Sequence, residues 1–140
     1  MIILDTNVVS EPSKLRANPN VLAWFDRQEQ LSLFLTAVNL AELKAGIALL
    51  PQGKRKENLQ HILDGALAKF VTPILPFDRE AAMAYADVVA HAKANRFTLP
   101  VADGQIAAIA KVHGFAVATR DVGPFVAAGV DVINPWEEGG

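Results

Sequence analysis

Short apolar runs alternate along the chain with longer segments whose apolar residues recur at helical spacing. Residues 2–4 form a β-branched run that stops at three polar residues, a pattern typical of a buried parallel strand. Four later runs have the same character and predict strands at residues 31–35, 74–75, 115–119 and 130–133. The order of the strands in the sheet cannot be inferred from these runs.

Helices are predicted between the strands, where capping residues precede apolar residues spaced three and four apart. Asn18, Thr36 and Asp78 are suited to begin helices, and Gly114 is suited to end one. The predicted helices span residues 18–28, 37–50, 54–70, 78–95, 101–113 and, more briefly, 125–128. Strands separated by helices in this order predict one α/β domain over residues 1–140 around a mainly parallel sheet.

The composition agrees with one compact domain that needs no covalent or metal cross-link. The 140 residues are 51% hydrophobic and include no cysteine, which excludes thiolate zinc sites and cysteine nucleophiles. No apolar run reaches the roughly 18 residues of a membrane span, and the first five residues read as a strand rather than a signal peptide. We therefore expect a cytoplasmic protein whose last residues, Glu137–Gly140, are frayed.

The charge and the missing motifs narrow the possible functions. A net charge of −2 argues against a domain that binds nucleic acid by bulk electrostatics, so any action on RNA should be local and catalytic. The three histidines are scattered, and no H-E-x-x-H, G-x-S-x-G or G-x-G-x-x-G motif occurs. Gly53 and Lys54 lack the first glycine of a P-loop. Hydrolases that use an activated serine or a nucleoside triphosphate are therefore disfavoured.

Three acids are predicted to lie at the carboxyl edge of the sheet, where chemistry collects in open α/β folds. Asp5 ends the first strand, and Asp121 follows the strand at residues 115–119 by two residues. Asp103 lies in the first turn of the helix at residues 101–113, and a helix that follows a strand begins at this edge.

Glu42 requires a separate argument because it lies within the predicted helix at residues 37–50. It shares one stripe of that helix with Val38, Ala45 and Leu49, which predicts a carboxylate on a buried apolar face that requires a partner. The alternative is an exposed position on this helix.

Four carboxylates at one edge would repel one another and raise one another's pKa values. A divalent cation would offset this repulsion, and ligands that are all oxygen favour Mg²⁺ or Mn²⁺ over Zn²⁺. Such an ion commonly binds substrate phosphate, which points to a metal-activated water attacking a phosphodiester bond. Each acid also has an ordinary interpretation, as a turn, cap or first-turn residue.

Other polar residues flank the acids. Thr6, Asn7 and Thr119 could orient a ligand, a water or a phosphate, or they could simply end their strands and turns. The basic candidates for contacting an RNA backbone are Lys93, Arg96 and Arg120.

Five short motifs occur in order along nearly the whole chain. They are IILDTN at residues 2–7, NLAEL at 39–43 with GI at 46–47, DGQIAAIA at 103–110, ATRD at 118–121 and VINPW at 132–136. Together and at this spacing they resemble the PIN-domain nucleases, and more closely the VapC and FitB-like toxins of bacterial toxin–antitoxin pairs.

This resemblance implies a three-layer α/β/α PIN-like domain that acts as a Mg²⁺-dependent endoribonuclease toxin. It also implies a metal-binding role for Asp5, Glu42 and Asp103. The fourth position departs from the pattern Thr-Arg-Asn followed three residues later by an acid, because that later residue is Pro124 here. The fourth role is therefore assigned to Asp121.

The resemblance further implies a homodimer and an antitoxin that wraps the toxin and blocks its acidic site, often with a basic side chain. Apolar stripes on two predicted helices could serve those contacts, or they could belong to the core. The stripes consist of Leu22, Trp24, Phe25, Leu59, Ile62 and Leu63.

Two other classes of function stay open. A receiver-like signalling domain also gathers acids and a threonine at strand ends and binds Mg²⁺, although it usually has adjacent acids after its first strand and a late lysine. A catalytically silent antitoxin-binding or RNA-binding module would accommodate the departure at Asp121 and Pro124.

Overall fold

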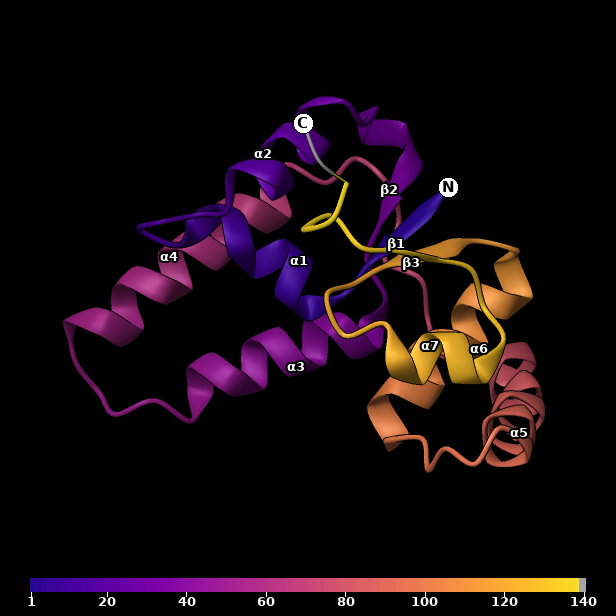
Figure 1. Ribbon diagram of the computed structural model, residues 1–140. Coiled ribbons are helices and arrows are strands. Elements are labelled where there is room, and N and C mark those ends of the chain that lie inside the picture. The colour runs from indigo at the N-terminus through magenta and orange to yellow at the C-terminus, as the bar shows by residue number, and fades with distance from the viewer. Residues whose placement is uncertain (139–140) are drawn as a thin grey trace.

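The computed structural model describes residues 1–138 and consists of four short parallel strands surrounded by helices (Figure 1). The strand order is β2-β1-β3-β4. The elements are β1 (Ile2–Leu4), α1 (Thr6–Ser10), the 3₁₀ turn η1 (Glu11–Ser13), α2 (Pro19–Asp26), the 3₁₀ turn η2 (Gln30–Ser32), β2 (Leu33–Phe34), α3 (Ala37–Ala48), α4 (Lys54–Ala68), α5 (Arg79–Ala94), α6 (Val101–His113), β3 (Ala116–Ala118), α7 (Gly123–Ala128) and β4 (Val132–Ile133).

Successive side chains of the central strands point to opposite faces of the sheet and pack into two different hydrophobic cores. Ile3 pairs with Val117 in register, and both side chains pack with α5, α6 and α7 on one face of the sheet. Their neighbours Leu4 and Ala118 pack on the other face with α1, α2 and the end of α4. This period of two, with helices on both faces, confirms the three-layer α/β/α architecture around a parallel sheet.

The strand predicted at residues 2–4 is confirmed at its full length as β1, whereas β2, β3 and β4 are shorter than the apolar runs that predicted them. The run at residues 74–75 contributes only a single parallel bridge, in which Leu75 pairs with Thr36 beyond the edge of β2. The chain also contains a helix that the pattern did not predict, because α1 has only five residues and too few positions to show a helical period. Asp5 begins α1 by accepting a hydrogen bond from the Thr6 backbone N–H.

The prediction that Glu42 lies on a buried stripe of its helix is wrong. Glu42 and Ala45 are exposed, Leu49 at the end of α3 is 85% exposed, and Val38 is only half-buried. The helix is apolar nearly all round, so its sequence did not distinguish the covered face from the open one. The single buried residue of α3 is the polar Asn39.

Parallel pairing places the carboxyl ends of β1, β2 and β3 at one edge of the sheet, from which α1 and α3 begin. Glu137 and Glu138 form an ordered turn, in which both backbone N–H groups donate to the Asn134 carbonyl, so the expected fraying does not begin there. The same expectation for Gly139 and Gly140 lies outside the described residues. Within residues 1–138 no helix is both long and apolar enough to cross a membrane.

Candidate active site

Asp5 is the central residue of the acidic edge. It follows β1 directly, is 7% exposed, and uses both carboxylate oxygens. Oδ1 accepts hydrogen bonds from the Thr6 backbone at 2.9 Å and from Asn39 Nδ2 at 3.3 Å, while Oδ2 accepts from Thr119 Oγ1 at 2.8 Å. Burial raises the pKa of Asp5, and the hydrogen bond from Thr119 opposes this rise by stabilising the charged form. The side chain is therefore held in one orientation by residues of α1, α3 and the segment directly after β3.

Glu42 reaches this edge from α3. Its Oε1 accepts a hydrogen bond from Thr6 Oγ1 at 3.2 Å. Thr6 therefore connects the two acids, because its backbone N–H donates to Asp5 and its hydroxyl donates to Glu42. Partial desolvation raises the pKa of Glu42, and the nearby charge of Asp5 adds to the rise. Glu42 therefore belongs to the edge although the argument that first placed it there does not hold.

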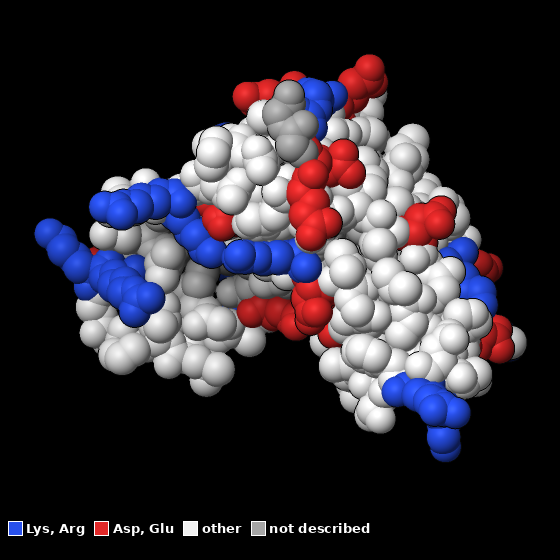
Figure 2. All heavy atoms as spheres, in the orientation of Figure 1, with Lys and Arg blue, Asp and Glu red and all other residues white. Residues whose placement is uncertain are grey.

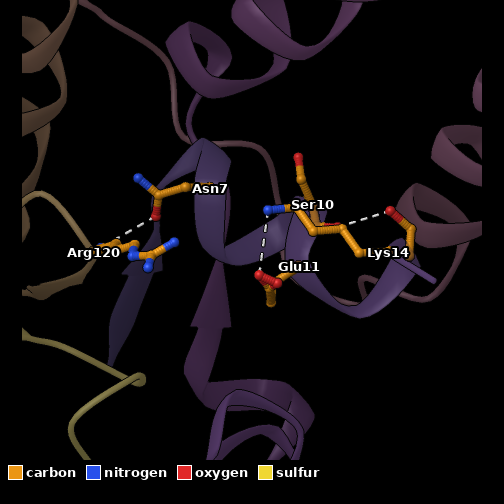
Figure 3. A network of polar contacts seen from close by, with 6 residues as sticks. Asn7, Ser10, Glu11, Lys14 and Arg120 are labelled. Atoms are coloured by element: carbon orange, nitrogen blue, oxygen red, sulfur yellow. Dashed lines mark hydrogen bonds and ion pairs between the residues drawn. The ribbon is translucent and has the colours of Figure 1, made fainter. Parts of the chain in front are cut away.

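Asp121 is connected to Asp5 through Thr119. The buried Thr119 hydroxyl donates to Asp5 and also accepts from the Asp121 backbone N–H at 3.1 Å. Asn7 fixes the same loop from α1, because its side-chain oxygen accepts the Arg120 backbone N–H at 3.2 Å (Figure 3). The loop between β3 and α7 is thus bonded to the first strand and helix of the chain, and Asp121 itself is exposed.

Asp103 completes the group from the first turn of α6 and is half-buried. Desolvation, followed by the charges of Asp5, Glu42 and Asp121, raises the pKa of Asp103 to about 6. The four carboxylates predicted from distant segments therefore lie within electrostatic reach of one another. Figure 2 shows acidic side chains gathered near the middle of one face, where Figure 1 places the start of α1 between α3 and α7.

The donor set fits a hard divalent cation, although the carboxylates do not converge on one point. They provide only oxygen ligands and repel one another, and within residues 1–138 no Lys or Arg forms an ion pair with any of them. In the same residues no three Asp, Glu or His side chains lie close enough together to hold an ion directly. This spacing is compatible with Mg²⁺, which commonly keeps several waters and uses one or two carboxylates together with substrate phosphate.

The three basic residues considered for contacting RNA are all exposed, and they lie in two separate segments of the chain. Arg120 lies between Thr119 and Asp121, and its guanidinium carbon lies 5.1 Å from the centroid of the Trp136 ring. Lys93 lies in the last turn of α5, and Arg96, with φ of 60°, closes that helix. Of these three cations, Arg120 is the one that is bonded into the loop of the acidic edge, through its backbone N–H to Asn7.

A groove of about 600 Å³ opens next to the acids between α1, α3 and α4. It begins at Thr6 and Glu42 and continues over apolar side chains of α3 and α4. The lining includes Leu43, Ile47, Leu50, Leu59, Ile62 and Leu63. Of the two stripes considered for partner contacts, the one on α4 borders this groove, with Ile62 43% exposed. On α2, Trp24 is only 3% exposed and belongs to the core, whereas Leu22 is 39% exposed.

Thr36 and Asn39 are site residues that the sequence reasoning missed. Thr36 caps α3 in a reciprocal capping box with Asn39, whose backbone N–H donates to the threonine hydroxyl. Asn39 Oδ1 accepts from Thr36 Oγ1 at 2.7 Å, which leaves its amide nitrogen to donate to Asp5. The signal was a capping residue followed three positions later by a polar side chain that can return the bond, at the start of a helix beside the acidic edge.

The sequence and the fold are similar to those of known proteins. The family model described as PIN domain matches residues 2–129. The Sinorhizobium fredii protein named VapC ribonuclease Y4jK is 50% identical over 138 residues, 98% of this chain and 99% of that protein. The toxin FitB of Neisseria gonorrhoeae is 46% identical over 139 residues, 99% of this chain and all of that protein. The crystal structure of FitAcB from the same organism superposes with a TM-score of 0.91 at 46% identity, covering 98% of this chain and 99% of that one.

Proposed function

Because the chain belongs to the PIN-domain family, we propose that it is the toxin of a toxin–antitoxin pair and cleaves RNA at its acidic edge. The relatives named a VapC ribonuclease and a FitB toxin match the chain over nearly its full length. The observation that supports the proposal most strongly is the group of four carboxylates at the end of β1, on α3, on α6 and in the loop after β3. Burial and then the charges of the other three acids raise the pKa of Asp103.

PIN-domain ribonucleases generally depend on divalent metals. We assign Mg²⁺ or Mn²⁺ binding to Asp5, Glu42, Asp103 and Asp121, with Asp121 taking the fourth role in the absence of an acid at Pro124. When bound, the ion would supply an activated water and neutralise charge on the scissile phosphate.

The chain's own residues would position these ligands. Thr119 and Asn39 hold the two oxygens of Asp5 from opposite sides, and Thr6 orients Glu42. Asn7 fixes the backbone before Asp121. Because these bonds form without any substrate, the acids need little rearrangement when the RNA arrives, which is the condition for efficient electrostatic catalysis.

The test is cleavage of RNA by the purified protein with and without Mg²⁺ or Mn²⁺. We expect cleavage with either ion, loss of cleavage with chelator, and a loss of at least 100-fold for Asp5→Asn, which preserves the shape of the side chain but removes its charge. Lys111→Ala, at the far end of α6 from Asp103, is the matched control and should cleave normally. Cleavage that persists in chelator and in Asp5→Asn would refute the proposal.

We further propose that the protein forms a homodimer, acts in the cytoplasm and is inhibited by an antitoxin. The solved relative described as FitAB bound to a DNA fragment has a TM-score of 0.91 to this chain. The groove beside Glu42 offers an antitoxin segment apolar contacts on α3 and α4, with the carboxylates at its end available to a basic side chain. Co-expression with the cognate antitoxin should abolish growth arrest, and Ile62→Glu should weaken that rescue while arrest itself persists.

The two other classes of function can be distinguished from a nuclease toxin. A receiver-like signalling domain is disfavoured by the PIN-domain match over residues 2–129. A catalytically silent binding module would cause no growth arrest on expression, whereas the nuclease should arrest growth and lose this effect in Asp103→Ala.

A further inference from the structure

Arg120 lies within the acidic edge, yet its side chain bonds to none of the acids. Among residues 1–138 its guanidinium makes no ion pair and no hydrogen bond, and it lies over the Trp136 ring at 5.1 Å. A guanidinium that contacts an aromatic ring through its face leaves the N–H donors in its plane available to a ligand. Among the described residues the guanidinium donors of Arg120 are therefore unused, in a residue that lies between Thr119 and Asp121 in the chain.

Both partners of this contact are fixed by the rest of the fold. The Arg120 backbone N–H donates to Asn7 of α1. The Trp136 backbone N–H donates to Asn134 Oδ1 at 3.0 Å, and its carbonyl accepts from Asn20 Nδ2 of α2 at 3.0 Å. The indole also packs against the core on the Leu4 face of the sheet. The backbone of Arg120 and the Trp136 ring are thus held by hydrogen bonds and packing, and the contact with this ring is the one that the structure gives the guanidinium.

We propose that Arg120, positioned by Trp136, binds a phosphate of the RNA strand next to the one that is cleaved. The inference rests on the proposed function, because it concerns the strand whose scissile phosphate lies at the acids. Arg120 follows Thr119, which donates to Asp5 at 2.8 Å, so its phosphate would lie immediately beside the carboxylates. The planar fork of a guanidinium matches two phosphate oxygens, and its charge offsets the repulsion between the strand and the acidic edge. Trp136 is a positioning residue in this arrangement.

Binding of a fluorescein-labelled single-stranded RNA, measured by anisotropy in chelator over a range of salt concentrations, tests the phosphate contact without cleavage. We expect Arg120→Ala to weaken binding about 10-fold and to reduce the magnitude of the log–log salt slope by about 0.7, the value for one phosphate contact to a single strand. Lys111→Ala removes the same charge from the far end of α6 and should change neither quantity. Equal effects of the two variants would overturn the inference.

Trp136 is tested by a pair of substitutions. Trp136→Leu retains Arg120 but removes the ring, so we expect KM for RNA to rise several-fold with kcat within about twofold, because a uniformly bound phosphate contributes to KM. Trp136→Phe retains an aromatic face and should restore most of the affinity. If both variants lose the same affinity, or if only thermal stability changes, the positioning role is wrong.

The two proposals fail in different ways. Cleavage by wild-type protein with no dependence on Arg120 would remove this inference alone. Arg120-dependent binding of RNA that is never cleaved, with or without Mg²⁺, would remove the nuclease proposal and leave the phosphate contact.

Discussion

At the scale of single residues, the buried hydroxyl of Thr119 joins two parts of the acidic edge. It donates to Asp5 Oδ2 and accepts the Asp121 backbone N–H, so one side chain orients both the first acid and the loop of the last one. Thr119→Val removes both bonds with little change of shape. Because a hydrogen bond to a charged group contributes about 1.5–3 kcal/mol, we expect RNA cleavage to fall by about 10- to 100-fold.

Thr119→Ser is the matched control for that substitution because it keeps the hydroxyl and loses only a methyl group. Its cleavage rate should stay within a few-fold of wild type. A valine variant as active as the serine variant would show that the two bonds do not position the acids.

The raised pKa of Asp103 predicts how the stability of the protein depends on pH in the absence of metal. Its folded-state pKa is raised from 3.8 to about 6, so between these values the folded state binds more protons than the unfolded state. The contribution of Asp103 to stability is therefore greatest below about pH 4 and is lost as pH rises through 6. Asp103→Asn should remove this loss, so we expect a higher Tm than wild type at pH 7 in chelator and a flatter dependence on pH, measured by calorimetry between pH 4.5 and 7.5.

Asp103→Asn should also lose RNA cleavage. The carboxylate charge that destabilises the metal-free protein is the same charge that we propose binds the divalent ion. Added Mg²⁺ should raise the Tm of wild type by binding the folded state and should raise that of Asp103→Asn less. A lower Tm for Asp103→Asn at pH 7 in chelator would contradict the repulsion described for this site.

At the scale of elements, the packing of α6 against α5 sets the position of Asp103. Gly104 is the next residue, and a Cβ there would lie 2.8 Å from Tyr85 Cε2 and 3.2 Å from Leu99 Cδ2. We expect Gly104→Ala to lower the free energy of unfolding by about 1–3 kcal/mol in spite of the better helix propensity of alanine, because the neighbours must shift. Urea unfolding measures the change.

Gly65→Ala in α4 is the matched control, because nothing lies within 4 Å of a Cβ built there. It should raise the free energy of unfolding by about 0.5–1 kcal/mol through helix propensity alone. Similar effects of the two substitutions would mean that the close approach of α5 and α6 is not required.

The elements also show what the sequence could and could not predict. Asp5 and Asp121 could be placed because each follows a strand at the carboxyl edge, a rule that depends only on parallel topology. Asp103 lies at the same edge although α6 follows α5 rather than a strand; α6 begins there because it leads directly into β3, whose amino end lies at the opposite edge. The buried face of α3 could not be predicted, because a helix with apolar residues on every side shows no preferred face. Leu49, expected on that buried face, is 85% exposed. Asn39 was overlooked because its contact with Asp5 joins residues 34 positions apart, which no local pattern reports.

At the scale of the whole molecule, a net charge of −2 limits how the protein can bind RNA. The candidate contacts to the strand are three separated cations, Lys93, Arg96 and Arg120, rather than a continuous basic surface. Three phosphate contacts to a single strand predict a log–log salt slope of about −2 for binding in chelator. A slope steeper than about −5 would require phosphate contacts from several further Lys or Arg residues and would contradict recognition by these three cations alone.

Anomalous diffraction from crystals soaked in Mn²⁺ tests whether Asp5, Glu42, Asp103 and Asp121 together bind one divalent ion. We expect a peak at the carboxyl edge of the sheet, about 2.0–2.3 Å from an oxygen of at least one of these carboxylates, with the others bonded to it directly or through water. Anomalous density that lies elsewhere on the protein, with these four side chains contacting no metal at saturating Mn²⁺, would rule out a metal site formed by the four acids.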